Sequence, residues 1–492
     1  MLEFETSTGN SYAWIEDIGI FIPTNPALNA ILKGDSNQNQ APGNDIYKKL
    51  KGNFDEKELK YYYDWVKKFD GVRAVLKERF ERAANQHFTK DDLKNFLFRE
   101  GFTQLILDVT EDCNFRCNYC IFSGNYVYYR SHSKKYMNID IAKKAIDYYF
   151  SLIKEGKRYN PLRRPTVSFY GGEPLLNFKL IKECMEYIED TYKDHKVRYS
   201  FTTNGSLLDT EKAEWFMKYD CHILISICGP KEEHDRLRVY YNGKGSFEDV
   251  MKNIKPIFEN HRTKLGSIIV YDLKTDLFIL DEFFKRHDVP PAILASPVAE
   301  LEGGKYFEQF SETDRLMFRK QVQWAQKCYV NNFNSREKAE RLSFFDLVFD
   351  EVTATIYAPG SFTLNSPVMP YSSACIPGKK LFVDIDGTFH ICERVNRSFP
   401  IGNVADGLDF EKIRSTICEY NLHLDKCKTC EVKKMCTKCY ANLSAGKKFM
   451  CTSKSCRTME SEEIRSLANA FTIAEINPKI IEKGLRGDRN VF

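Results

Sequence analysis

The sequence predicts an α/β protein built around an open, partial (β/α)6 barrel of the TIM type. Between about residues 101 and 296, short apolar runs rich in β-branched residues alternate with helical stretches, the pattern of parallel strands joined by helices. A smaller region with strand and helix patterns, residues 1–95, precedes this part. A cysteine-rich region follows it, since nine of the 16 cysteines lie between Cys375 and Cys456.

The chain therefore divides into five predicted parts. They are a small N-terminal α+β domain (1–95), the barrel (96–305), a helical bridge (306–368), a cysteine-rich domain (369–460) and a C-terminal helix and tail (461–492). In the first part, segments 4–14 and 18–23 predict a hairpin, and 56–69 and 71–84 predict helices. The predicted barrel strands are 103–110, 168–170, 200–203, 223–227, 266–271 and 292–295.

Composition and patterning exclude several classes of protein. The formal net charge is +4, and no basic stripe is interleaved with aromatic residues, so we expect no nucleic-acid partner. The sequence starts without the basic and apolar segments of a signal peptide. No apolar run approaches the roughly eighteen residues that a membrane span needs, so we expect no membrane partner and a cytoplasmic location. In that reducing compartment, cysteines at cluster spacing indicate metal binding.

Cys113, Cys117 and Cys120 form a C-x3-C-x2-C motif directly after a predicted buried strand. A structural zinc ion or a closed iron–sulfur cluster takes four thiolates, so three on one loop can hold a [4Fe–4S] cluster with one iron left open. The carboxyl end of a strand is also where α/β barrels place their chemistry. The spacing therefore favours a reactive cluster over three unrelated buried cysteines or a zinc knuckle.

A second segment, 168–176, reads Ser-Phe-Tyr-Gly-Gly-Glu-Pro-Leu-Leu. Its two glycines let the backbone approach a ligand closely, and Glu173 can accept hydrogen bonds from an ammonium group. Together with the cysteine motif, this segment resembles the radical S-adenosylmethionine (SAM) enzymes. The resemblance implies a [4Fe–4S] cluster on the three cysteines and SAM bound beside it. The residues that it assigns to SAM are Tyr119, Gly171, Gly172, Glu173, Pro174, Asn204, Ser226 and Arg238.

The resemblance also implies a role for several of these residues. Glu173 binds the methionyl amino group, Tyr119 packs by the adenine, and Arg238 pairs with the carboxylate. Ser226 contacts the ribose or carboxylate region of SAM. The chain departs from the family pattern at Cys228, where an aspartate is usual.

The cysteine-rich region opens on Cys375 and Cys392, which flank a predicted β-hairpin with an Asp-Gly turn over 381–390. A C-x2-C-x5-C-x2-C run follows, and two C-x2-C pairs alone would suggest zinc. The full order of cysteines instead resembles the SPASM extension of radical SAM enzymes, which carries two auxiliary [4Fe–4S] clusters. That makes three clusters in the chain.

The resemblance divides the C-terminal cysteines into two ligand sets. The first set is Cys375, Cys392 and Cys439, and the second is Cys427, Cys430, Cys436 and a late cysteine, for which Cys456 suits better than Cys451. Cys418 or Cys451 could close the first set; without either, its cluster keeps an open iron. Cys436-x2-Cys439 stands where the usual pattern has C-x3-C.

A small strand-and-helix unit before such a barrel resembles the leader-recognition elements of peptide maturases, which bind an extended peptide at a sheet edge. A generic packing domain is the alternative. The resemblance implies an enzyme that cleaves SAM and uses the 5′-deoxyadenosyl radical to form a thioether in a Cys-containing ribosomal precursor peptide, of the sactipeptide or ranthipeptide type. A flavodoxin or ferredoxin would supply electrons.

Glu393 directly follows Cys392, and an acidic residue at that place acts as a base in the related sulfatase maturases. A surface or supporting role is the alternative for Glu393. Among enzymes, formylglycine-forming sulfatase maturation, carbon–carbon cross-linking and alcohol oxidation remain open. A non-catalytic iron–sulfur or zinc regulator is the rival from another class.

Overall fold

The computed structural model describes residues 2–15, 19–35, 44–85, 88–335, 343–357, 374–423, 427, 430–433, 435–436, 438–450 and 453–485. Cys451, one of the predicted cluster ligands, lies outside the described residues. No helix in these ranges is long and apolar enough to cross a bilayer.

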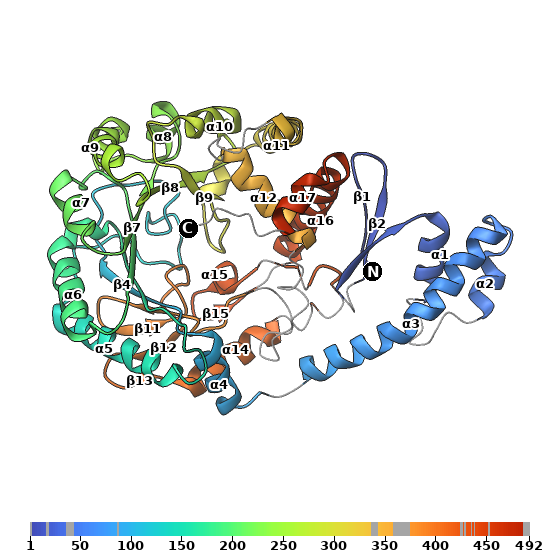
Figure 1. The fold of residues 1–492 in the computed structure, drawn as a ribbon, viewed down its shortest axis with the longest axis horizontal. Coiled ribbons are helices and arrows are strands. Elements are labelled where there is room, and N and C mark those ends of the chain that lie inside the picture. Colours follow the sequence, from blue (N-terminus) through green and yellow to red (C-terminus); the bar gives the residue numbers. More distant parts are fainter. Residues whose placement is uncertain are drawn as a thin grey trace.

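Six parallel strands form the centre of the molecule, and each pairs with the next in chain order (Figure 1). They are β4 (Gln104–Thr110), β5 (Thr166–Gly171), β6 (Arg198–Thr203), β7 (Cys221–Ser226), β8 (Leu265–Tyr271) and β9 (Ala292–Pro297). The helices that flank them are α5 (Ile139–Gly156), α6 (Phe178–Thr191), α7 (Thr210–Phe216), α8 (Lys231–Leu237), α9 (Phe247–Asn260) and α10 (Leu277–Lys285). The α/β class and the partial barrel are confirmed.

Alternation along the strands decides which side chains reach the core. On β4, Leu105, Leu107 and Val109 belong to the large hydrophobic cluster that the strands share with their helices. Because successive side chains point to opposite faces of a sheet, Asp108 lies on the other face, toward the interior of the barrel. A buried polar residue such as Asp108 is thereby compatible with an apolar outer core.

The barrel sheet continues into the cysteine-rich region, which the sequence did not indicate. The predicted hairpin is present as β10 (Lys380–Val383) and β11 (Thr388–His390), and β10 pairs in parallel with β4. Strands β12 (Pro400–Asn403) and β13 (Gly407–Leu408) complete a ten-stranded sheet. The hairpin turns at Gly387, whose positive φ of 86° suits glycine. The predicted boundary at residue 369 thus separates two segments that share one sheet.

The N-terminal unit contains a three-stranded antiparallel sheet of β1 (Leu2–Glu5), β2 (Ser11–Ile15) and β3 (Ile20–Thr24). Segment 4–14 is therefore a hairpin by itself, turning near Gly9, and the second predicted segment adds a third strand. A single helix, α3 (Glu56–Asn85), replaces the two predicted helices. One glycine inside a helix, here Gly71, costs only about 1 kcal/mol and does not end it.

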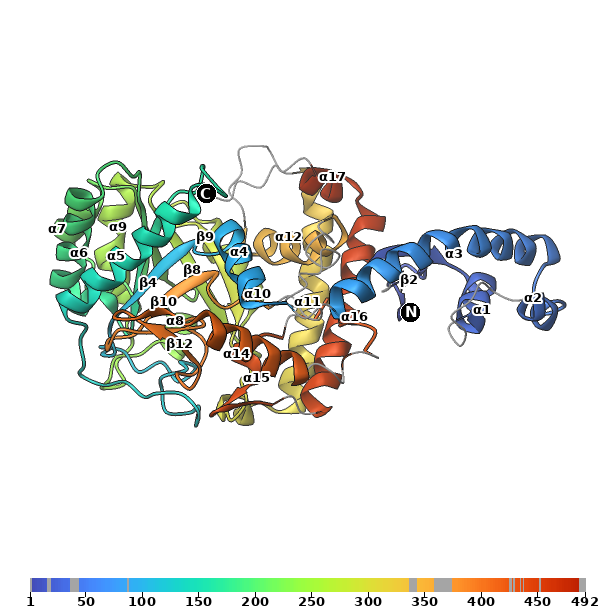
Figure 2. The ribbon, with the colours of Figure 1, turned by 90° about the horizontal axis from the view of Figure 1, so that it is seen from below.

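Helices cover both faces of the N-terminal sheet. Ala13, Ile15 and Ile22 pack against α1 (Pro26–Asp35) and α3, while Phe4 and Trp14 pack against α16 (Ser453–Ile476). Helices α1 to α3 project from one end of the molecule (Figure 2). The remaining helices are α2 (Asn44–Leu50), α4 (Lys90–Glu100), α11 (Glu312–Asn332), α12 (Phe344–Tyr357), α14 (Phe410–His423), α15 (Tyr440–Leu443) and α17 (Lys479–Leu485). The N-terminal sheet and α16 therefore pack together, although they lie far apart in the sequence.

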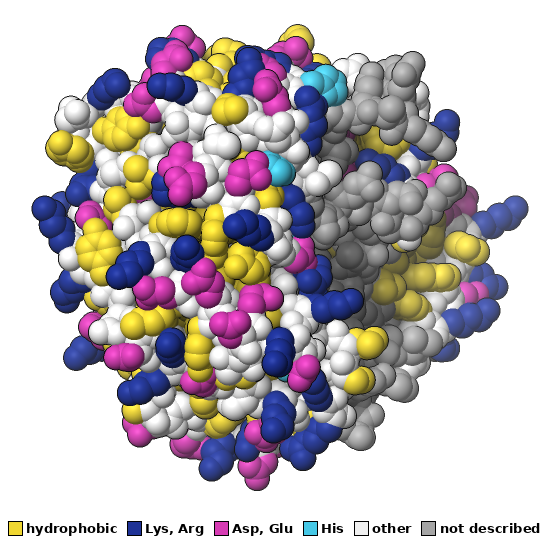
Figure 3. Space-filling view, turned by 60° about the vertical axis from the view of Figure 1, so that its left-hand side comes forward, with side chains coloured by type: hydrophobic (Ala, Val, Ile, Leu, Met, Phe, Trp, Pro, Cys, Tyr) yellow, Lys and Arg dark blue, Asp and Glu magenta, His cyan; other side chains and the backbone are white. Residues whose placement is uncertain are grey.

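On the face shown in Figure 3, positive and negative side chains are intermixed. Lys and Arg side chains lie among Asp and Glu side chains there, and apolar side chains are scattered between them. Small apolar patches of this kind are normal on a protein surface.

Candidate active site

A single cavity brings together the residues of the two main motifs. It has a volume of about 700 Å³, its open mouth included. Its lining includes Cys113, Cys117, Cys120, Tyr119, Gly171, Gly172, Glu173, Pro174, Asn204, Ser226 and Arg238. All three motif cysteines and all eight residues assigned to SAM thus face one space.

The cavity also has walls that the motifs did not indicate: Phe115, Ile121, Phe122, His132, Tyr170, Thr202 and Thr203. All of them except His132 lie within two residues of a motif residue in the sequence. Cys228, the departure from the family pattern, is fully buried and does not line the cavity.

Backbone hydrogen bonds hold the cysteine loop against the glycine segment. The Gly172 N–H donates to the Thr110 carbonyl at 2.9 Å, and the Glu173 N–H donates to the Asp112 carbonyl at 2.8 Å. A Cβ atom at residue 172 would lie 2.1 Å from the Asp112 carbonyl oxygen. We expected these glycines to admit a ligand; the structure shows that Gly172 admits the cysteine loop itself, so only glycine fits there.

The donor set fits an iron–sulfur cluster on this loop. The backbone N–H groups of Phe115 and Phe122 donate to the sulfurs of Cys113 and Cys120, each at 3.4 Å. Burial raises the pKa of the Cys120 thiol to about 11, which a coordinating metal would reverse by binding the thiolate.

No group of three or more His, Cys, Asp or Glu side chains among the described residues is arranged to hold a single metal ion. A [4Fe–4S] cluster does not require its thiolates to converge on one ion, because each iron binds its own cysteine. Three thiols spread over one cavity wall therefore suit a cluster better than one zinc ion.

Glu173 is a buried carboxylate with three hydrogen bonds. Its Oε1 accepts from the Thr203 hydroxyl at 2.7 Å and the Leu175 N–H at 3.1 Å, and its Oε2 accepts from the Asn204 N–H at 2.7 Å. A carboxylate offers about four acceptor positions, so Oε2 keeps one. Burial raises the pKa of Glu173 although these hydrogen bonds oppose it. A cationic ligand in the cavity would stabilise the charged form.

Arg238 and Tyr119 also line the cavity. Arg238 is buried, its guanidinium donates to the Tyr119 hydroxyl, and its Nε has no hydrogen-bond partner among the described residues. An unpaired buried N–H group is costly, and a bound carboxylate would satisfy it. The cavity therefore offers both an anionic and a cationic group, the complement of an amino acid moiety.

The C-terminal cysteines lie in two groups. Burial raises the pKa of Cys392 to about 12, and the neighbouring Cys439 thiol acts in the same direction. Burial likewise raises the pKa of Cys436 to about 12, with Cys427 and Cys430 adding to it.

The remaining cysteines lie around these groups. Cys375 is exposed, and Cys375, Cys418 and Cys439 all lie near the buried hydroxyl of Tyr440. Cys456 is half-buried on α16. Cys418 is therefore placed beside the first set, as one of the two candidates to close it.

Glu393 lies between the two cysteine regions. Its Oε2 is buried and has no hydrogen-bond partner among the described residues. Its charge also raises the pKa of Tyr170, a cavity wall residue, after the larger effect of burial. The position is compatible with a role beside the cavity.

Comparisons with known proteins agree with this site. The model of the Radical SAM superfamily matches residues 107–276. A GTP 3′,8-cyclase of Haemophilus ducreyi is 30% identical over 300 residues, which cover 60% of this chain and 78% of that protein. A cysteine-type anaerobic sulfatase-maturating enzyme of Clostridium novyi is 27% identical over 193 residues, 38% of this chain and 49% of that protein.

The fold extends the likeness beyond the matched sequence. A solved structure, native anSMEcpe with bound AdoMet and Cp18Cys peptide, superimposes with a TM-score of 0.54 at 20% identity and covers 76% of this chain and 99% of that one. The matches span between 34% and 58% of the length of the first curated relatives. With the cyclase match and the family model together, the chain belongs to the radical SAM superfamily.

Proposed function

We propose that this chain is a radical SAM enzyme that modifies a ribosomally made, Cys-containing peptide, forming a thioether. One observation carries the proposal: the cluster motif and the SAM-binding residues line one cavity, and the sheet around that cavity continues into a second cysteine-rich region. The superfamily implies a [4Fe–4S] cluster and SAM. Two further clusters in the C-terminal region belong to the proposal.

The residues of the chain bind and orient the cofactor. Cys113, Cys117 and Cys120 would hold the cluster, Glu173 the amino group of SAM and Arg238 its carboxylate. When bound, the cluster and SAM supply an electron and a 5′-deoxyadenosyl radical that abstracts a hydrogen atom. The buried walls of the cavity exclude water from that reaction.

A peptide partner has support from the relatives and from the N-terminal sheet. The sulfatase-maturating enzyme and the Cp18Cys complex are named for protein or peptide substrates. In this chain the three-stranded sheet has helices on both faces, which leaves its edge strands β1 and β3 for an added strand. A leader would bind there through backbone hydrogen bonds.

Thioether formation requires a balanced loss of two hydrogens from the peptide. One leaves the substrate carbon as a hydrogen atom taken up by the 5′-deoxyadenosyl radical, which becomes 5′-deoxyadenosine, and the other leaves the cysteine thiol as a proton. The remaining electron would need an acceptor, which an oxidised cluster held by the cysteine-rich region would supply, and a flavodoxin or ferredoxin would supply the electron that cleaves SAM. Glu393, whose Oε2 has no described hydrogen-bond partner, would accept the thiol proton.

Anaerobic incubation of the reduced, reconstituted protein with SAM and a precursor peptide tests the proposal. A thioether product has lost two hydrogens and no longer reacts with an alkylating agent at its cysteine. A carbon–carbon cross-link also loses two hydrogens but keeps an alkylatable thiol, and formylglycine loses sulfur. Absence of 5′-deoxyadenosine would instead favour a regulator.

The state of the first C-terminal cluster has its own test. If Cys375, Cys392 and Cys439 leave an iron open, a Cys-containing peptide should perturb the paramagnetic resonance spectrum of a Cys113/Cys117/Cys120→Ala protein. A peptide with Cys→Ser should not. A spectrum that ignores the thiol, while the wild-type protein still forms the thioether, would rule out direct ligation.

A further inference from the structure

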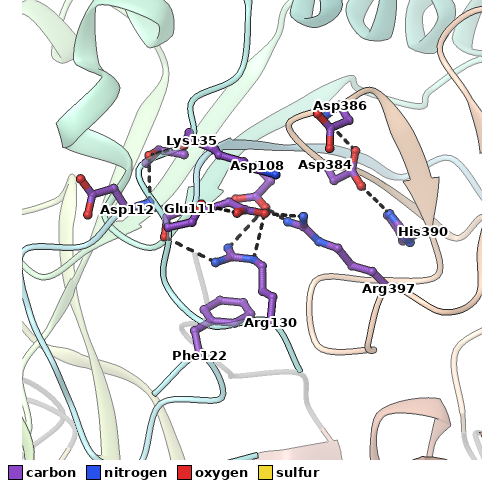
Figure 4. A network of polar contacts seen from close by, with 12 residues as sticks. Asp108, Glu111, Asp112, Phe122, Arg130, Lys135, Asp384, Asp386, His390 and Arg397 are labelled. Atoms are coloured by element: carbon purple, nitrogen blue, oxygen red, sulfur yellow. Dashed lines mark hydrogen bonds and ion pairs between the residues drawn. The ribbon is translucent and has the colours of Figure 1, made fainter. Parts of the chain in front are cut away.

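Two buried carboxylates and two half-buried guanidiniums form a ring beside the cavity (Figure 4). Asp108 on β4 and Glu111 at the start of the cysteine loop supply the carboxylates, and Arg130 and Arg397 supply the guanidiniums. Each arginine pairs with both carboxylates: Arg130 lies 3.4 Å from Asp108 and 3.6 Å from Glu111, and Arg397 contacts both. The Ser133 hydroxyl also donates to Glu111 at 2.6 Å.

The ring joins two distant parts of the chain. Three members come from the barrel strand and the segment that follows it, whereas Arg397 lies between β11 and β12 in the cysteine-rich region. Asp108 is fully buried, and its Oδ1 has no hydrogen-bond partner within the described part of the chain. Burying charges is expensive even when they are paired, and an apolar replacement is often as stable. Stability alone therefore does not account for the ring.

The ring reaches the cavity through one aromatic side chain. The Arg130 guanidinium stacks on the Phe122 ring at 3.8 Å from its centre, as Figure 4 shows. Phe122 lines the cavity, and its backbone N–H donates to the sulfur of Cys120. An arginine stacked on an aromatic ring is well placed only if its own position is fixed, and the two carboxylates fix it here.

We propose that Arg397 and Asp108 are positioning residues for the SAM site. Together they hold Arg130 over Phe122, so that the cysteine-rich region sets one wall of the cavity in which SAM binds. The inference rests on SAM binding at this cavity, as proposed above, but not on the identity of the peptide.

The test compares Arg397→Met with Arg414→Met in the full-length, reconstituted protein. Arg414 is on α14 in the same region, and within the described part of the chain it pairs with the exposed Glu411 and, weakly, with Cys418. Arg397→Met should weaken SAM affinity, measured by calorimetry, about tenfold and should speed hydrogen–deuterium exchange over residues 120–133. Arg414→Met should change neither. Arg397→Lys keeps the charge but cannot span both carboxylates, so its effects on SAM affinity and on exchange should lie between those of the two Met variants.

A double-mutant cycle separates positioning from general destabilisation. If Arg397 acts through Phe122, then Arg397→Met should weaken SAM binding much less in a Phe122→Leu background than in the wild type. Additive losses, or unchanged affinity and exchange in a folded Arg397→Met protein, would overturn the inference. If Arg397→Met does not fold, Arg397→Lys carries the same cycle. Because no peptide is used, failure of the proposed peptide chemistry would leave this result intact.

Discussion

The two cysteine regions of this molecule are held against different parts of the chain. The loop at Cys113–Cys120 lies at the ends of parallel strands, tied by backbone hydrogen bonds to the glycine segment and by the Arg116 N–H to the Val239 carbonyl at 2.8 Å. The segment around Cys430 and Cys436 instead packs against the N-terminal sheet and the C-terminal helix α16. Its Val432 and Met435 are buried there.

Because of this difference, the stability of each region depends on a different part of the chain. Hydrogen bonds within the barrel fix the first loop whatever happens at the chain ends, whereas the second loop depends on Leu2, Phe4 and Trp14, more than 400 residues away in sequence. The proposed leader-binding sheet is therefore a structural support of the second cysteine group. Deleting the whole N-terminal unit would remove that support, so single substitutions test the comparison more cleanly.

The largest expected effect separates the two regions chemically. Replacing Cys113, Cys117 and Cys120 together by Ala should abolish SAM cleavage and remove about one third of the iron, because one of the three proposed clusters is lost. Iron and sulfide analysis of the purified variant measures this. Complete loss of iron would mean that the two regions do not assemble independently.

Trp14→Ala should break the second region and spare the first. Trp14 is fully buried in the cluster that contains Val432 and Met435, so its truncation should cost about 3–5 kcal/mol. We expect a lower unfolding temperature and faster hydrogen exchange at 430–436, with exchange at 113–120 unchanged. Tyr61→Ala, at a side chain that is 66% exposed, is the matched control. Equal changes in both loops would contradict the comparison.

Asp108 should make the stability of the barrel region depend on pH. Burial raises the pKa of Asp108 to about 6, although Arg130 and Arg397 oppose it and Glu111 and Asp384 add to it. Since the folded protein then binds the proton more tightly than the unfolded chain, this group stabilises the fold at low pH, and the contribution is lost as pH rises through about 6. The shift corresponds to about 3 kcal/mol.

An Asp108→Asn protein tests this dependence, because it lacks the titrating group. The urea unfolding midpoints of the wild type and the variant should converge toward pH 4. As pH rises from 4 to 6, the midpoint of the wild type should fall relative to that of the variant. A constant difference across that range would show that Asp108 does not titrate there. Asp406→Asn, at an exposed site, controls for the loss of a carboxylate.

The smallest effect concerns the edge of the N-terminal sheet. A leader peptide that adds a strand should slow hydrogen exchange of backbone amides in β1 or β3, with little change in the barrel. Exchange measured with and without the precursor peptide checks this, and a peptide that lacks its leader is the control. Protection confined to the barrel would place peptide binding elsewhere.

Local patterns determined a large part of this protein. Alternation and apolar runs predicted the six barrel strands, and the two motifs predicted cavity residues from Cys113 to Arg238. These signals are readable because each depends on neighbours a few residues apart. A strand needs its own apolar period, and a cluster loop needs thiols that one short segment can bring together.

Only the tertiary structure decided how distant segments meet. The pairing of β10 with β4, the contact of Trp14 with Met435, and the ring that joins Asp108 to Arg397 link residues hundreds of positions apart. A charged residue on a strand looks the same in the sequence whether it faces water or a buried partner. Its role depends on which other segment fills the space beside it, and that is settled by the packing of the whole chain.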